Sequence, residues 1–118
     1  MAYSLKYTLN SDGTSYSVTG YTDITASDTV EIPPKYNNKP VTSIGGEAFY
    51  YCTSLTSMTI SKSVTLVGNF AFSDCGTIEI NYDGTTAEWK DLVSINRGVF
   101  KNTRYTCNCI DGVVKKSR

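Results

Sequence analysis

Hydrophobic and polar positions recur in the middle of the chain with a spacing of 23 residues. Residues 41–52 read VTSIGGEAFYYC and residues 64–75 read VTLVGNFAFSDC, so six of the twelve positions are identical. Ile44 opposite Val67 is a conservative seventh match, and a fragment of the downstream pattern occurs earlier as VEIP at 30–33. Such self-similarity indicates a solenoid, in which each unit buries its apolar side against the next one.

Each unit is expected to alternate short strands with tight turns. The segments 41–44 and 58–60 contain β-branched residues, which favour strands. The Ala-Phe pair of each unit lies in a polar-flanked turn that follows glycine. When copies stack, equivalent apolar positions form columns inside the solenoid. We therefore expect four repeated positions to be core rather than cofactor contacts or nucleophiles: Phe49, Phe72, Cys52 and Cys75.

The two ends of the chain carry different patterns, which we expect to close the stack. Apolar and polar residues alternate through 3–21 around an Asn-Ser-Asp-Gly turn, which predicts a β-hairpin. Further on, Thr85 and Glu88 have the spacing of a capping box, which predicts the start of a helix. Its apolar face would consist of Trp89, Leu92 and Val93. Residues 105–114 predict a closing hairpin around an Asp-Gly turn.

The repeated unit resembles the BspA-like, or treponemal-type, leucine-rich repeat, which runs roughly as V-T-x-I-G-x-x-A-F-x-x-C-x-x-L-x-x-I-x-I-P. It stands here at 41–60 and, more loosely, at 64–82. Residues 30–41 are similar to the entry segment of that family, and residues 82–89 and 109–112 are similar to its C-terminal module. The resemblance implies a non-catalytic scaffold that recognises other proteins and, in surface-exposed relatives, serves adhesion.

Pattern and resemblance together predict a mainly β protein. The expected fold is a short leucine-rich-repeat solenoid with an N-terminal β-hairpin cap and a C-terminal cap made of a helix plus a hairpin. A chain of 118 residues is long enough for one domain with its own core. That single domain, 1–118, is expected to divide into an N-terminal cap (1–29), repeats (30–82) and a C-terminal cap (83–118).

Composition argues against an enzyme. The chain has no histidine, which excludes Ser-His-Asp and Cys-His catalysis and histidine metal sites. Carboxylates that could form pairs, Asp74 with Glu79 and Asp83 with Glu88, are better explained as surface turn residues. The four cysteines lack zinc-site spacing and are expected to be structural thiols. No phosphate-binding motif is present, and no cofactor or metal is implied.

Charge and hydropathy say little about partners and location. The net charge is zero, although residues 97–118 carry six basic side chains against one acidic one. A solvated basic end is a better explanation than a nucleic-acid site, because no nucleic-acid motif accompanies it. No apolar run is long enough for a signal peptide or a membrane span. The default location is therefore cytoplasmic, or surface-exposed or in a virion if the chain belongs to a longer or exported system.

Candidate contact residues come from comparing the two units. An apolar residue whose counterpart is polar is expected to face outward: Tyr50, Tyr51, Phe70 and Leu66 stand opposite Ser73, Asp74, Glu47 and Ser43. Exposed aromatic residues are common anchors of protein interfaces, so Tyr50, Tyr51 and Phe70 are the main candidates, although these three could instead pack under the irregular terminal caps. Glu31, Thr59 and Asn81 are expected to line the outward face of a sheet and contribute to specificity.

Two functional hypotheses follow. The first is a non-catalytic protein-binding leucine-rich-repeat module, an inhibitor or effector that masks the surface of a partner protein. The alternative is a structural or self-assembling component of a phage particle or bacterial surface, for which self-association is expected.

Overall fold

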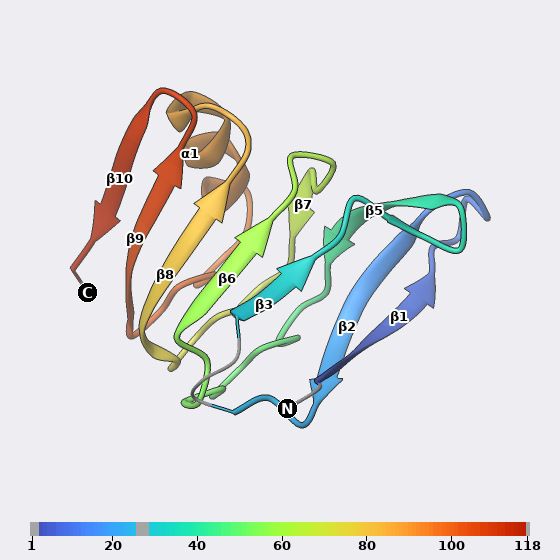
Figure 1. Cartoon of the computed structure of the whole chain (residues 1–118), viewed down its shortest axis with the longest axis horizontal. Helices are drawn as coiled ribbons and strands as arrows, with labels where there is room; N and C mark the ends of the chain where they lie inside the picture. Colours follow the sequence, from blue (N-terminus) through green and yellow to red (C-terminus); the bar gives the residue numbers. More distant parts are fainter. Residues whose placement is uncertain (1–2, 26–28, 118) are drawn as a thin grey trace.

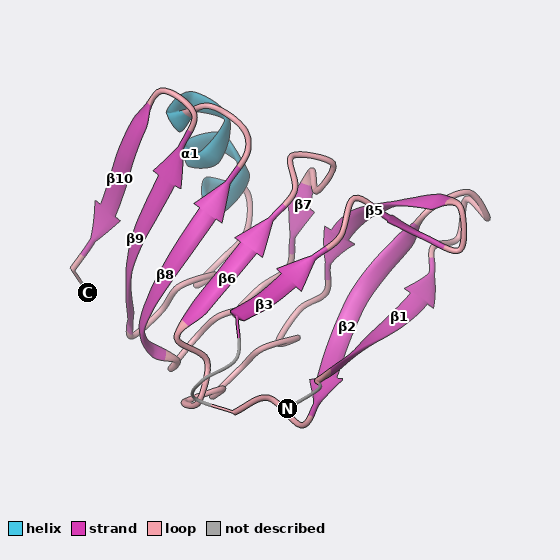
Figure 2. Cartoon of the chain, in the orientation of Figure 1, coloured by secondary structure: helices cyan, strands magenta, loops and turns pink. Residues whose placement is uncertain are grey.

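Two five-stranded β-sheets pack on one hydrophobic core (Figure 1). The computed structural model describes residues 3–25 and 29–117. The strands are β1 (Ser4–Leu9), β2 (Tyr16–Thr22), β3 (Thr29–Ile32), β4 (Lys35–Tyr36), β5 (Lys39–Ile44), β6 (Ser57–Ile60), β7 (Leu66–Val67), β8 (Gly76–Tyr82), β9 (Thr103–Cys109) and β10 (Gly112–Lys116), and the helix is α1 (Thr86–Ser94). Figure 2 shows that strands and loops dominate and that the helix lies near one end. The mainly β prediction is confirmed.

The first sheet has the order β10-β9-β8-β6-β3. Strands β3, β6, β8 and β9 are parallel, as expected for stacked repeats, and β10 closes the edge in the antiparallel sense. Burial alternates along the parallel strands, with Met58 and Ile60 of β6 inside and Thr59 facing outward. This alternation assigns one face of the sheet to the core and leaves the other polar.

The second sheet has the order β1-β2-β5-β4, and β7 also pairs with β5. Strand β5 pairs in parallel with β2 on one side and with β7 on the other. Strands β1 and β2 form the predicted N-terminal hairpin. The short β4–β5 hairpin turns through Asn37 and Asn38, both with positive φ. Asparagine tolerates this conformation better than most residues, which suits it to a two-residue hairpin loop.

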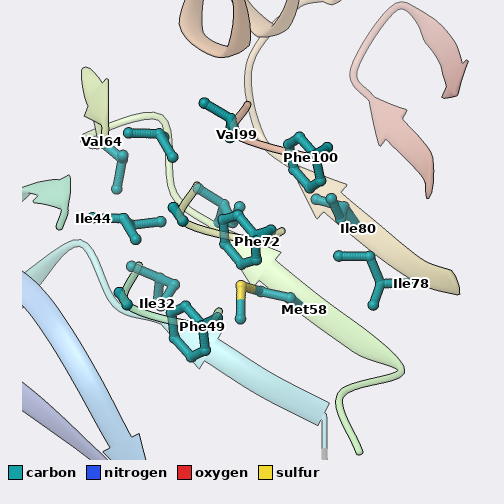
Figure 3. Close-up of a cluster of buried hydrophobic side chains, with 14 of the residues drawn as sticks. Ile32, Ile44, Phe49, Met58, Val64, Phe72, Ile78, Ile80, Val99 and Phe100 are labelled. Carbon is teal, nitrogen blue, oxygen red and sulfur yellow. The ribbon is translucent and has the colours of Figure 1, made fainter. Parts of the chain in front are cut away.

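Three equivalent turns lead into strands β6, β8 and β9 of the first sheet, and we call them the turn stack: residues 45–52, 68–75 and 96–103. Each turn donates backbone hydrogen bonds of 2.8 to 3.0 Å to the next. Phe49, Phe72 and Phe100 occupy equivalent places and lie in a row (Figure 3), with ring centroids 5.2 and 5.1 Å apart. Tyr21 adds a fourth ring, 5.5 Å from that of Phe49. The phenylalanine column predicted from the repeat is therefore present, and it is one turn longer than the sequence comparison indicated.

The C-terminal end is closed as predicted by α1 and the β9–β10 hairpin. Thr85 and Glu88 form the capping box: the Thr85 hydroxyl accepts from the Glu88 N–H, and the Glu88 carboxylate accepts from the Thr85 N–H. Trp89 and Leu92 are buried, and the Trp89 Nε1–H donates to the Tyr105 hydroxyl at 3.2 Å. Among the described residues, no helix is long and apolar enough to cross a membrane.

Candidate protein-binding surface

Two positions of every turn in the stack adopt a left-handed backbone conformation. The first position holds Glu47, Phe70 and Gly98 in successive turns, and the second holds Tyr51, Asp74 and Asn102, all with φ between 56° and 62°. Glycine tolerates this conformation freely, and asparagine and aspartate tolerate it better than other residues. A bulky side chain there is strained.

The strain falls on two of the predicted contact residues, Tyr51 and Phe70. Such outliers persist only where the surrounding structure holds them, and they cluster at functional sites. Since sister turns place Asp74, Asn102 and Gly98 at these positions, the fold itself does not require aromatic residues there. The aromatic substitution is therefore a property of this surface rather than of the repeat.

Tyr50 and Tyr51 project from the first turn into solvent. Their side chains are 49% and 68% exposed, and their ring centroids lie 6.2 Å apart. Phe70, in the second turn, is half-buried rather than exposed, because its ring packs over Gly98 of the third turn. A Cβ atom added at Gly98 would lie 2.5 Å from the Phe70 ring. We call Tyr50, Tyr51 and Phe70 the aromatic edge of the turn stack. The sequence prediction placed Phe70 farther outward than it lies.

A cleft of about 280 Å³ runs along this edge, lined by Glu47, Tyr50, Phe70, Ser73, Asp74, Lys101 and Asn102. The Lys101 ammonium lies 5.9 Å from the centroid of the Phe70 ring, within the range of a cation–π contact. Asp74 accepts hydrogen bonds from the Asn102 side chain at 2.9 Å and the Ser73 hydroxyl at 2.8 Å. Those bonds, the first the larger effect, hold the pKa of Asp74 below its usual value. The cleft thus offers two aromatic rings beside an ionised carboxylate.

The other predicted contact residues lie elsewhere. Leu66 is 46% exposed on β7 and does not line the cleft. Glu31, Thr59 and Asn81 form one row across the outward face of the first sheet, in direct register. Asn108 extends this row, and its side-chain N–H donates to the side-chain Oδ1 of Asn81 at 3.1 Å. The sequence missed Asn108 because it was assigned to the closing hairpin, although its alternation with the buried Cys107 indicated an outward side chain.

The cysteines serve the stack. Cys52, Cys75 and Cys107 are buried, and the Cys75 thiol donates to the Phe49 carbonyl at 3.0 Å. Burial raises the pKa of Cys75 to about 11, so this thiol is a poor nucleophile. The Cys107 and Cys109 sulfurs are 3.8 Å apart, too far for a disulfide. Among the described residues, no group of three metal-ligating side chains comes together.

Comparison with known proteins agrees with this repeat geometry. The model of the BspA type leucine rich repeat region matches residues 21–110 with six copies. The chain belongs to this family. Its structure is also similar to the crystal structure of a leucine-rich repeat protein from T. pallidum, with a TM-score of 0.57 and 28% sequence identity. That match covers 65% of this chain and 40% of the treponemal one, and no curated protein matches.

Membership of this repeat family indicates a general class of function. Leucine-rich repeats typically form non-enzymatic modules that bind other proteins. The fold does not specify the partner or the binding face, which depend on side chains particular to each member. In this BspA-type chain, the aromatic edge is one place where the side chains of the two units differ in chemistry.

Proposed function

We propose that this protein is a binding module that masks a surface of a partner protein through the aromatic edge formed by Tyr50, Tyr51 and Phe70. The observation that carries the proposal is the placement of Tyr51 and Phe70 in strained left-handed conformations on an exposed turn. Sister turns accommodate the same backbone with glutamate or glycine at the position of Phe70, and with aspartate or asparagine at that of Tyr51. Leu66 and the row of Glu31, Thr59 and Asn81 are secondary contact candidates on other faces.

The chemistry of the edge suits a protein interface. Tyrosine presents a large, rigid amphipathic area with few rotatable bonds, so little conformational entropy is lost when it is buried by a partner. The neighbouring Glu47 and Asp74 carboxylates favour a partner that brings a basic or hydrogen-bond-donating group beside the rings. An anchor of this kind contributes most when it enters a dry pocket on the partner.

The size of the molecule is consistent with masking. A standard interface covers about 800 Å² on each partner. The accessible surface of this chain is 6256 Å², so one such interface would occupy about an eighth of it. A small rigid binder of this kind can block a partner's surface without doing any chemistry of its own.

The test is affinity capture from the native host with the wild-type chain, followed by the double variant Tyr50→Ser/Tyr51→Asp. That variant installs the residues of the sister turn, Ser73 and Asp74, so we expect it to fold normally. We expect a stoichiometric heteromeric complex with the wild type and at least a tenfold weaker one with the variant, because two exposed aromatic anchors are removed.

The matched control is Ile110→Ser, which removes an apolar side chain of comparable exposure, 69%, at the far hairpin. It should leave capture unchanged. Equal capture by the double variant and the wild type would refute the aromatic edge as the contact surface.

A further inference from the structure

The turn stack is held together by a repeating set of three backbone hydrogen bonds. Each turn uses alternate N–H groups as donors to alternate carbonyls of the next turn. The bonds from the first turn are Glu47 to Asn69 (3.0 Å), Phe49 to Ala71 (2.8 Å) and Tyr51 to Ser73 (2.8 Å), and those from the second are Phe70 to Arg97 (3.0 Å), Phe72 to Val99 (2.8 Å) and Asp74 to Lys101 (2.8 Å). The same pattern therefore holds across both junctions.

The third turn carries the equivalent donors, but no fourth turn follows among the described residues. The matching N–H groups are those of Gly98, Phe100 and Asn102. Within residues 3–25 and 29–117, none of the three donates a hydrogen bond to the chain. Backbone N–H groups in proteins are nearly always paired with protein or water. The stack therefore ends in a row of three donors that are available to an acceptor from outside the described chain.

A hollow of about 250 Å³ lies at this end of the stack. It is lined mainly by Val93, Gly98, Phe100, Lys101, Tyr105 and Lys116. Its lining contains two lysines and no carboxylate, and Lys116 is oriented by donating to the Thr103 carbonyl at 2.9 Å. We call this hollow, together with the three N–H donors, the open end.

The surroundings of the open end are also basic. A neighbouring hollow shares Tyr105 and Lys116 with it, adds Arg104 and Lys115, and likewise has no aspartate or glutamate in its lining. The charged side chains in the linings of both hollows are thus all basic, although the chain as a whole is neutral. The Asp74 carboxylate lies at the margin of the open end, where it accepts from the Asn102 side chain. Such a surface attracts a negatively charged partner and repels a basic one.

We infer that the open end binds an extended acidic segment of a partner protein, whose backbone takes the place of a fourth turn. Its alternate carbonyls accept the Gly98, Phe100 and Asn102 N–H groups, as the Arg97, Val99 and Lys101 carbonyls accept those of the second turn. Acidic side chains of the segment face Lys101 and Arg104. A peptide fits better than a nucleic acid, because a peptide repeats the carbonyl spacing that already pairs with these donors twice within the stack. The open end adjoins the cleft of the aromatic edge and shares Lys101 and Asn102 with it. Tyr50 and Tyr51 line neither basic hollow, so substitutions of these two tyrosines separate the two assignments.

Amide hydrogen exchange of the free protein tests the premise. We expect the amides of Phe70, Phe72 and Asp74 to exchange slowly and those of Gly98 and Asn102 to exchange at least tenfold faster, since only the former are hydrogen-bonded within the chain. Equal protection in the second and third turns would overturn the inference, because the donors would then already be occupied.

Titration with a blocked eight-residue peptide of alternating aspartate and serine tests the binding itself, with amide resonances as the readout. We expect shifts centred on Gly98, Phe100 and Asn102, and affinity about tenfold lower for Lys101→Glu and for Arg104→Glu. Lys35→Glu, an exposed lysine on β4, is the charge-matched control and should leave affinity unchanged. The variant Tyr50→Ser/Tyr51→Asp should bind the peptide as the wild type does.

Two results would overturn the inference. One is the absence of shifts at the three amides at every peptide concentration. The other is a preference for an oligothymidylate of equal charge, which would assign the basic end to nucleic acid instead.

Discussion

At the scale of single residues, the turn stack shows which positions serve the fold and which do not. Gly98, Asp74 and Asn102 adopt left-handed conformations that their side chains tolerate, whereas Tyr51 and Phe70 adopt the same conformations at a cost of about 1 to 2 kcal/mol each. Tyr51 and Phe70 therefore lower the free energy of unfolding at these two positions.

Tyr51→Asn separates stability from binding. We expect it to raise the free energy of unfolding by about 0.5 to 1 kcal/mol, because asparagine adopts the left-handed conformation more readily than tyrosine. Partner binding should weaken at the same time, since the more exposed anchor is lost. Urea denaturation and the capture experiment measure the two effects. Tyr50→Asn is the control: Tyr50 has an ordinary φ, so no gain in stability is expected, and a loss of stability in Tyr51→Asn would refute the strain.

Gly68→Ala tests how closely the turns approach one another. A Cβ atom at Gly68 would lie 2.3 Å from the Gly46 nitrogen and 2.7 Å from its Cα, and backbone cannot move aside as a flexible side chain can. We expect a loss of at least about 2 kcal/mol in unfolding free energy. Gly20→Ala is the control, because its nearest neighbour is the Lys6 side chain at 3.6 Å. Equal stabilities of the two variants would contradict this close packing.

Comparison of the sister units predicted the exposure of Tyr50, Tyr51 and Leu66, but not the position of Phe70. Its counterpart Glu47 is exposed, which suggested an outward ring. The ring instead lies over Gly98, a residue of a turn that was not recognised in the sequence. A comparison of two repeats contains no information about a third unit, so it could not predict the contact between Phe70 and Gly98.

At the scale of elements, the sequence predicted the N-terminal and closing hairpins, the capped helix and two of the three turns, but not the short β4–β5 hairpin. The third was missed because α1 precedes it and lengthens the spacing between equivalent phenylalanines from 23 residues to 28, between Phe72 and Phe100. Its cysteine position also holds Thr103. Stacking tolerates both changes, because the interior columns require equivalent volumes and hydrogen bonds rather than a fixed period.

Thr103 takes over the role of the cysteine column. Its hydroxyl donates to the Phe72 carbonyl at 2.6 Å and accepts from the Cys75 N–H at 2.9 Å, as the Cys75 thiol donates to the Phe49 carbonyl one turn earlier. We expect Thr103→Val to lower the free energy of unfolding by about 1 to 3 kcal/mol, because two buried backbone groups lose their partner. Thr103→Ser keeps the hydroxyl, so its free energy of unfolding should fall clearly less in the same urea titration. A larger loss of stability in Thr103→Ser than in Thr103→Val would show that packing, not hydrogen bonding, stabilises this column.

The helix cap predicts an acid-sensitive element. The Thr85 N–H and hydroxyl, bonded to the Glu88 carboxylate, hold the pKa of Glu88 below its ordinary value of 4.5. A carboxyl whose folded pKa is lowered adds stability that is complete above the unfolded pKa and is lost as pH falls through the folded one. We therefore expect stability to decline below about pH 4.5, and to decline less steeply in Glu88→Gln. Denaturant titrations at a series of pH values measure this decline. Identical pH profiles of stability for the wild type and Glu88→Gln would exclude the helix cap as a source of the acid sensitivity.

At the scale of the whole molecule, stacking places different chemistry on separate surfaces. The outward face of the first sheet is polar, the turn stack carries the aromatic edge, and the C-terminal end is basic. Because the buried side chains form one continuous cluster, these surfaces are held rigidly relative to one another. A neutral chain of this size can thus present an acidic aromatic cleft and a basic groove at once, which net charge alone conceals.

The same arrangement decides between a module that binds a partner and one that assembles with itself. The β9–β10 hairpin exposes Ile110 and Val113, and β10 is the edge strand of the first sheet. Both features would favour self-assembly through this edge. That edge also carries Lys115 and Lys116, and lysines on an edge strand oppose pairing with a second copy. We therefore expect light scattering to give the monomer mass of 12.9 kDa at every concentration. If the mass instead rises with concentration and Val113→Lys restores the monomer, the edge strand is an assembly surface and the self-assembling component becomes the better description.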